Sequence, residues 1–224
     1  MMAGPLLLSL KLASVVAMLL LLVGVPAAYW LAFSRWRGKF LVESVVALPL
    51  VLPPTVLGFY VLVAMGPRGP LGKLWSAFFG HGLAFTFAGL VLASVLYSLP
   101  FAVQPLTAAF ESVDRKLLDA SAVLGAGKLR TFWRVILPLS IPGVVTAVVL
   151  SFAHTMGEFG VVLMVGGNLA GVTRTASIAV YDDVQALDYA AANQTALVLL
   201  LISFAVLCAV YGMNRRVWKL WPAS

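Results

Sequence analysis

The sequence of 224 residues contains few charged side chains, one cysteine and two histidines. Charged residues make up 10% of the chain and hydrophobic residues 62%, whereas about 25% of the residues in soluble domains are charged. This composition excludes an ordinary soluble domain and predicts an integral membrane protein. The single cysteine, Cys208, lies in an apolar stretch, which excludes a disulfide within the chain and a metal site built on cysteines.

Sequence patterns of catalysis are also missing. His81 and His154 fall in different apolar stretches and form no His-x-x-Glu-His or Glu-x-x-His pattern that could hold a metal. The segment Gly125-Ala-Gly-Lys128 lacks the first glycine of a phosphate-binding loop, and Leu129 stands where Ser or Thr is needed. No Gly-x-Ser-x-Gly pattern supplies a nucleophile. We therefore expect a chain that is not an enzyme and binds neither a cofactor nor a metal.

Five uncharged stretches are long enough to cross about 30 Å of hydrocarbon at about 1.5 Å per residue. They predict one all-α transmembrane domain over residues 1–224, with spans at about 12–34, 44–66, 83–103, 135–157 and 190–213. The uncharged piece 159–173 is too short to span and is expected to be re-entrant or extracellular. We expect the first span to be retained rather than cleaved, and no further domain after Trp221.

The basic residues are distributed unequally between the loops. With the amino terminus outside, eleven of the fifteen fall on the cytoplasmic side and three outside, and Lys11 lies near the outer end of the first span. This imbalance fits the positive-inside rule. The cytoplasmic ones are Arg35, Arg37, Lys39, Arg115, Lys116, Lys128, Arg130, Arg134, Arg215, Arg216 and Lys219, and the external ones are Arg68, Lys73 and Arg174. This orientation places the carboxyl terminus and a long loop at 104–134 in the cytoplasm. Because the bases flank apolar spans, they indicate a lipid bilayer as the partner and not a nucleic acid.

Prolines interrupt the second span at Pro49, Pro53 and Pro54, and Pro100 and Pro105 mark the exit of the third. Proline frees backbone groups that must find partners inside the protein or in a wet cavity. The second span is therefore a candidate for lining a pathway, with Pro53 and Pro54 as candidate pathway or gate residues. An ordinary proline kink is the alternative.

The loop at 104–134 mixes charge with an apolar pattern. Positions at helical spacing carry Val113, Leu117, Ala120 and Leu124, and Gly125 and Gly127 then stop the helix. A short amphipathic helix cannot bury its apolar stripe alone, so it needs its own bundle, lipid or a partner protein. We expect a partner; the alternative is a surface helix with a glycine cap.

This loop resembles the signature of ABC-importer permeases, which reads Glu-Ala-Ala, three residues, Gly, nine residues, Ile, one residue, Leu-Pro. Here the register is Asp119-Ala120-Ser121, Gly125, Val135 and Leu137-Pro138, with Asp for Glu, Ser for the second Ala and Val for Ile. The resemblance implies a coupling helix that docks on an ATP-hydrolysing subunit. Its implied site residues are Asp119, Ala120, Ser121, Gly125, Ala126, Leu137 and Pro138.

Segments 48–58, 65–72 and 157–160 look like the molybdate-importer permeases, and the likeness runs from about residue 8 to residue 211. The family implies a five-helix type I importer fold like that of methionine permeases. It also implies a homodimer in the bacterial inner membrane, two ATP-binding cassette subunits, an external substrate-binding protein and an oxyanion substrate, with molybdate first. A sulfate or tungstate permease is the alternative. An ion-coupled secondary carrier is another, although it should carry ionisable residues at span centres.

Glu158, at the outer end of the fourth span, is a candidate gate residue. An intramembrane carboxylate is a functional suspect, but its negative charge would repel an anionic substrate, so we favour a structural or gating role over direct binding. Arg174, in the same external connection, is a second candidate. It could pair with Glu158 or with Asp182, Asp183 or Asp188, or be solvated.

Overall fold

The computed structural model describes residues 3–220, except for the side chains of 209–211 and 213–220. Four residues named in the sequence analysis therefore lie outside the description. They are Trp221 and, for their side chains, the basic residues Arg215, Arg216 and Lys219, which were counted for the predicted orientation. The described range is helical and contains no strand. Its elements are α1 Ala3–Phe33, α2 Lys39–Val51, α3 Pro54–Met65, α4 Pro70–Phe79, α5 Phe87–Glu111, α6 Arg115–Val123, α7 Lys128–Thr131, the π-helix η1 Phe132–Ile136, α8 Leu137–Leu139, α9 Ile141–Gly157, α10 Gly160–Gly166, α11 Ala176–Gln185 and α12 Tyr189–Leu220.

Among the described residues, α1, α5 and α12 are each long and apolar enough to cross a membrane. Two further spans are possible if each sharply bent helix pair counts as one. These pairs are α2 with α3, bent by 114°, and the stretch Lys128–Leu139 with α9, bent by 73°. The five stretches expected from the sequence fall on these three helices and two pairs.

The boundaries of the spans differ from the expected ones at two groups of prolines. Pro100 and Pro105 lie inside α5, which continues to Glu111, so the first part of the expected loop at 104–134 is helix. Neighbouring helices can compensate for the backbone groups that proline frees in a membrane helix. At Ser140 prolines do interrupt the helix. Pro138 and Pro142 flank the bend that splits the expected span 135–157.

Three helices form the centre of the bundle. The long α1 packs on both α5 and α9, and α5 packs on α9. On α9, Gly143 permits a close approach, because an added Cβ would lie 2.2 Å from the Cβ of Ala109 on α5. Small residues at such contacts are typical of helices packed in membranes, where the hydrophobic effect does not hold them together.

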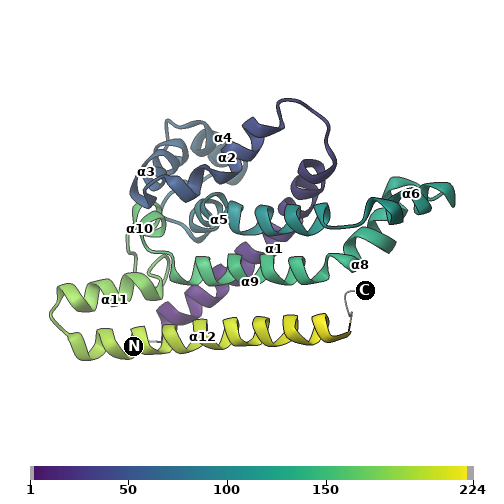
Figure 1. Ribbon diagram of the computed structural model, residues 1–224. Helices are drawn as coiled ribbons and strands as arrows, with labels where there is room; N and C mark the ends of the chain where they lie inside the picture. The colour runs from purple at the N-terminus through teal and green to yellow at the C-terminus, as the bar shows by residue number, and fades with distance from the viewer. Residues whose placement is uncertain (1–2, 221–224) are drawn as a thin grey trace.

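The bundle has two distinct ends. In Figure 1, α6 projects beyond the bundle at one end, and α10 and α11 lie at the other. The connections contain helices of their own. Helix α4 contains Lys73, α10 forms in the short apolar piece 159–173, and α11 begins just after Arg174. The candidate residues therefore separate into a group around α6 and a group around α10.

Candidate functional site

The first group begins where α5 ends. Asp114 caps α6, with its Oδ1 accepting a hydrogen bond from the Lys116 backbone N–H at 2.9 Å. At the other end, the Ala126 N–H donates to the Ser121 carbonyl at 3.0 Å, and Gly125 has a φ of 74°. A left-handed residue after the last turn is the usual glycine stop of a helix. The predicted short helix and its glycine stop are therefore confirmed.

The apolar face of α6 is only partly used by its own chain. Val113 is buried against the bundle, but Leu117 is 47% exposed and Leu124 is 84% exposed. Asp119 and Ala120 are also exposed. A groove of about 340 Å³ runs along this face between α6 and the chain that follows it. Its lining residues are Leu117, Ala120, Ser121, Leu124, Ala126, Arg130, Arg134 and Val135.

The predicted signature residues do not all face outward. Ser121 is buried, and its hydroxyl lies 2.7 Å from that of Thr131, so it links α6 to α7. Gly125 is exposed, and a Cβ added there would meet no other part of the chain. Leu137 and Pro138 lie apart from α6, in α8, just before the bend at Ser140. The signature thus combines an exposed tip with the segment that joins it to α9.

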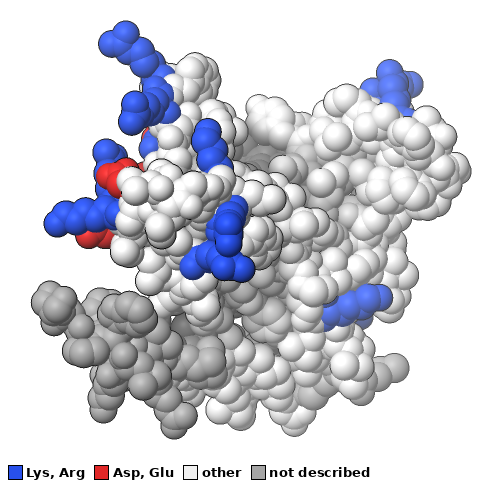
Figure 2. All heavy atoms as spheres, turned by 90° about the vertical axis from the view of Figure 1, so that its right-hand side faces the viewer, with Lys and Arg blue, Asp and Glu red and all other residues white. Residues whose placement is uncertain are grey.

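Basic side chains surround this tip. The exposed ones on α6 and the following segment are Arg115, Lys116, Lys128, Arg130 and Arg134. Figure 2 views the molecule from the end that carries α6, and it shows most of the visible Lys and Arg toward one side of that face, with few acidic groups among them and a few more basic groups on the opposite side. The surface around α6 therefore combines exposed apolar side chains with positive charge.

Two features of this region carry no sequence signal. The chain forms a π-helix at Phe132–Ile136, a distortion that occurs frequently at functional sites. Phe132 packs edge-on against Tyr29 of α1 and Phe110 of α5, with ring centroids 5.4 and 6.0 Å away. This aromatic contact holds the segment after α6 on the bundle.

The second group lies around the bend of α2 and α3. Pro54 begins α3, and a Cβ on Gly160 would come within 2.7 Å of its ring. The turn between α9 and α10, which carries Glu158, therefore packs on the proline bend. The Glu158 side chain is buried, and its Oε1 accepts a hydrogen bond of 2.6 Å from the Val161 N–H at the start of α10.

Arg174 does not pair with Glu158. Its Nε donates to Oδ1 of Asn168 at 2.8 Å and lies 3.4 Å from Oδ2 of Asp182. The Asn168 amide in turn donates to both carboxylate oxygens of Asp182 at 2.9 Å. Of the partners considered from the sequence, the structure selects Asp182, and it adds Asn168, which no motif had indicated.

His154 also lies toward the α10 end of α9. Its Nδ1 is 2.9 Å from the Ser98 hydroxyl of α5, and its ring stacks on Phe101 with centroids 3.9 Å apart. The Ser98 hydroxyl also lies 3.1 Å from that of Thr155. His154 is thus an interhelical histidine, held between α9 and α5.

Two solved ABC transporters share this fold. A methionine ABC transporter, MetNI, superposes with a TM-score of 0.74 over 95% of this chain and 94% of its own, at 17% identity. A bacterial alginate ABC transporter superposes with a TM-score of 0.77 over 96% of this chain and 79% of its own, at 16% identity. The fold is therefore that of a type I ABC-importer permease.

The sequence assigns the chain to a family within this class. Residues 13–219 match the binding-protein-dependent transport system inner membrane components, and the chain belongs to that family. The molybdenum transport system permease protein ModB of Azotobacter vinelandii is 56% identical over 209 residues, which cover 93% of this chain and 92% of the relative. The ModB protein of Escherichia coli K12 is 42% identical over 179 residues, which cover 80% of this chain and 78% of the relative. A fold of this family implies an ATP-binding subunit and a substrate-binding protein as partners.

Proposed function

We propose that the chain is the membrane-spanning subunit of an ATP-driven molybdate importer and that it performs no catalysis itself. The 56% identity with a molybdenum transport permease over nearly the whole of both chains carries this proposal. Energy then has to come from a partner that hydrolyses ATP. The exposed apolar and basic surface of α6 is where we place that partner.

The proposed docking surface uses Asp119, Ala120, Gly125 and Ala126. Small residues allow a partner to approach α6 closely, and the exposed Leu117 and Leu124 give it apolar area to bury. We assign Ser121 to holding α6 in place through Thr131. Leu137 and Pro138 would carry a shift of α6 to the bend that begins α9.

The transport path would lie between two copies of the chain. One bundle of five spans is small for enclosing a pore, and a symmetric pair solves that problem. We place α6 in the cytoplasm and the amino terminus outside, because the basic side chains gather around α6. The external substrate-binding protein would then meet the end that carries α10 and α11. Two ATPase subunits, one at each α6, would bias the pathway between inward and outward openings through their different affinities for the two states.

Pro53, Pro54, Glu158 and Arg174 remain the candidate pathway or gate residues. The packing of Gly160 on Pro54 supports treating the proline bend and the Glu158 turn as one unit. Because Glu158 is buried and bonded to the start of α10, we assign it a structural part in that unit and not substrate binding. Arg174 would order the external connection through Asn168 and Asp182.

Co-purification of the tagged chain from its native membrane tests this proposal. We expect an ATP-hydrolysing subunit to accompany the wild type and to be lost when Asp119 and Gly125 are altered. Gly127→Ala is the control, because Gly127 is exposed and an added Cβ there meets no other part of the chain. Vesicles containing the assembly should then take up molybdate only with ATP and the binding protein. Uptake without ATP would replace the proposal by a secondary carrier.

The oxyanion itself is tested separately. Molybdate should compete for the purified binding protein more strongly than the smaller sulfate, because both relatives quoted above are molybdenum permeases. Preference for sulfate would keep the importer assignment and change its substrate.

A further inference from the structure

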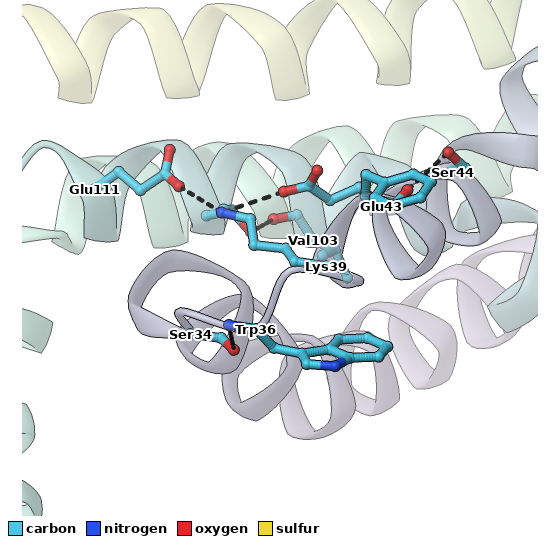
Figure 3. Close-up of polar contacts among 9 residues, drawn as sticks. Ser34, Trp36, Lys39, Glu43, Ser44, Val103 and Glu111 are labelled. Atoms are coloured by element: carbon cyan, nitrogen blue, oxygen red, sulfur yellow. Dashed lines mark hydrogen bonds and ion pairs between the residues drawn. The ribbon is translucent and has the colours of Figure 1, made fainter.

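One cluster of charges joins elements that the proposed function treats separately. Figure 3 shows Lys39 between two carboxylates, with its Nζ 3.2 Å from Oε1 of Glu43 and 3.5 Å from Oε1 of Glu111. Lys39 is the first residue of α2, and Glu43 lies one turn further along the same helix. Glu111 is the last residue of α5. The same ammonium group therefore makes one bond within a helix and one bond between helices.

Glu111 places one end of the interhelical ion pair at the base of α6. The chain leaves α5 at Glu111 and enters α6 at Arg115, so Glu111 sits at the base of the coupling segment. Two residues earlier, the Ala109 carbonyl accepts hydrogen bonds from Ser112, at 2.8 Å, and from Ser140 at the bend before α9, at 3.2 Å. The end of α5 is thus tied to both ends of the segment that contains α6.

Lys39 places the other end of the ion pair on the helix that leads to the proline bend. It begins α2, whose far end meets the proline bend of 114° into α3. Pro54 at that bend packs against Gly160, beside Glu158. The bond from Lys39 to Glu111 therefore connects the base of α6 with the helix that leads to the candidate gate.

We propose that Lys39 and Glu111 are positioning residues, and that their ion pair couples a shift of α6 to the α2–α3 pair. This inference rests on the proposed function. The Lys39 and Glu111 side chains are 26% and 49% exposed, so the pair can open without leaving a buried charge unpaired. An exposed pair is also weak, and a weak contact can favour one of two conformations without trapping it.

Three neutral variants separate this role from a general effect of charge. In vesicles holding the permease with its ATPase subunit and binding protein, Glu111→Gln should lower molybdate uptake per ATP hydrolysed by about two- to five-fold, the range expected of an exposed ion pair. Lys39→Met should do the same, and the double variant should be no worse than either. Glu43→Gln, which removes only the intrahelical pair, should transport as the wild type does. Co-purification of the ATPase subunit should be unchanged in all of them.

A charge exchange provides the rescue. The double variant Lys39→Glu with Glu111→Lys should restore uptake per ATP toward the wild-type value, whereas each single reversal should impair it. The inference is overturned if Glu43→Gln and Glu111→Gln behave alike, if the neutral changes add, or if the exchange restores nothing. Wild-type assemblies without ATP-dependent uptake would instead refute the proposed function and the inference with it.

Discussion

The hydroxyl oxygens of Ser121 and Thr131 lie 2.7 Å apart and join α6 to α7 across the turn at Gly125. The contacts of α6 with the rest of the bundle are limited, and its apolar Leu117 and Leu124 are largely exposed. This hydrogen bond is therefore one of the contacts that set the direction in which α6 points. An isolated signature would assign Ser121 to the partner, but the structure uses it within the chain.

Removing that bond should loosen α6 without unfolding the bundle. Thr131→Val keeps the shape of the side chain but leaves the buried Ser121 hydroxyl without this partner, which costs about 1–3 kcal/mol locally. We expect faster hydrogen exchange in residues 115–131 and weaker retention of the ATPase subunit. Replacing both residues, by Ser121→Ala and Thr131→Val, should be milder than Thr131→Val alone. Unchanged exchange in Thr131→Val would contradict this role.

Substitutions at Gly125 can test docking of the partner with little backbone strain. Its φ of 74° disfavours most side chains, but Asp and Asn tolerate the left-handed region, and a Cβ there meets nothing in the chain. We expect Gly125→Asp to insert normally and to uncouple ATP hydrolysis from transport, because it adds a charge at the proposed contact. The isosteric Gly125→Asn shows how much of the loss comes from charge. Normal transport by the Asp variant would remove Gly125 from the docking surface.

The sequence predicted the parts of the molecule that depend on local pattern. Uncharged length located the spans, and the spacing from Val113 to Leu124 with Gly125 located α6. It failed where tertiary contacts override local preference. Pro105 reads as a helix end but lies inside α5. Proline is tolerated inside membrane helices, where neighbouring groups can satisfy the backbone carbonyl that it leaves free.

Contacts distant in sequence account for the rest of what was missed. Lys39 and Glu111 are separated by 72 positions, so only the packing of α2 beside α5 reveals their bond. Phe132, in the π-helix Phe132–Ile136, likewise packs on the rings of Tyr29 and Phe110, which are distant in sequence. No periodic pattern or motif in a single sequence marks either of these contacts.

The Arg174 cluster predicts a geometry-dependent effect at the external end. Arg174→Lys keeps the charge but removes the Nε–H that bonds to Asn168, so it should loosen the connection almost as much as Arg174→Ala. The expected cost is small, about 1 kcal/mol or less, because the side chains of Arg174 and Asp182 are 38% and 31% exposed. Limited proteolysis of residues 167–175 would measure it. If Arg174→Lys matches the wild type, charge alone holds the cluster.

Glu158 can be tested for charge against hydrogen bonding. Its Oε1 accepts the Val161 N–H at 2.6 Å, and a glutamine can offer an oxygen at the same place. Glu158→Gln should therefore keep most transport and thermal stability, whereas Glu158→Ala should lose the cap of α10 at a cost of about 1 kcal/mol.

These two variants distinguish a gating charge at Glu158 from a structural cap. If a negative charge at Glu158 operates a gate, Gln and Ala should impair uptake equally, even though only Ala lowers the melting temperature. If Glu158 is a cap, uptake and stability should fall together, and only in Glu158→Ala. We expect the second pattern, because the side chain is buried and already bonded to the backbone that it would have to release to face a substrate.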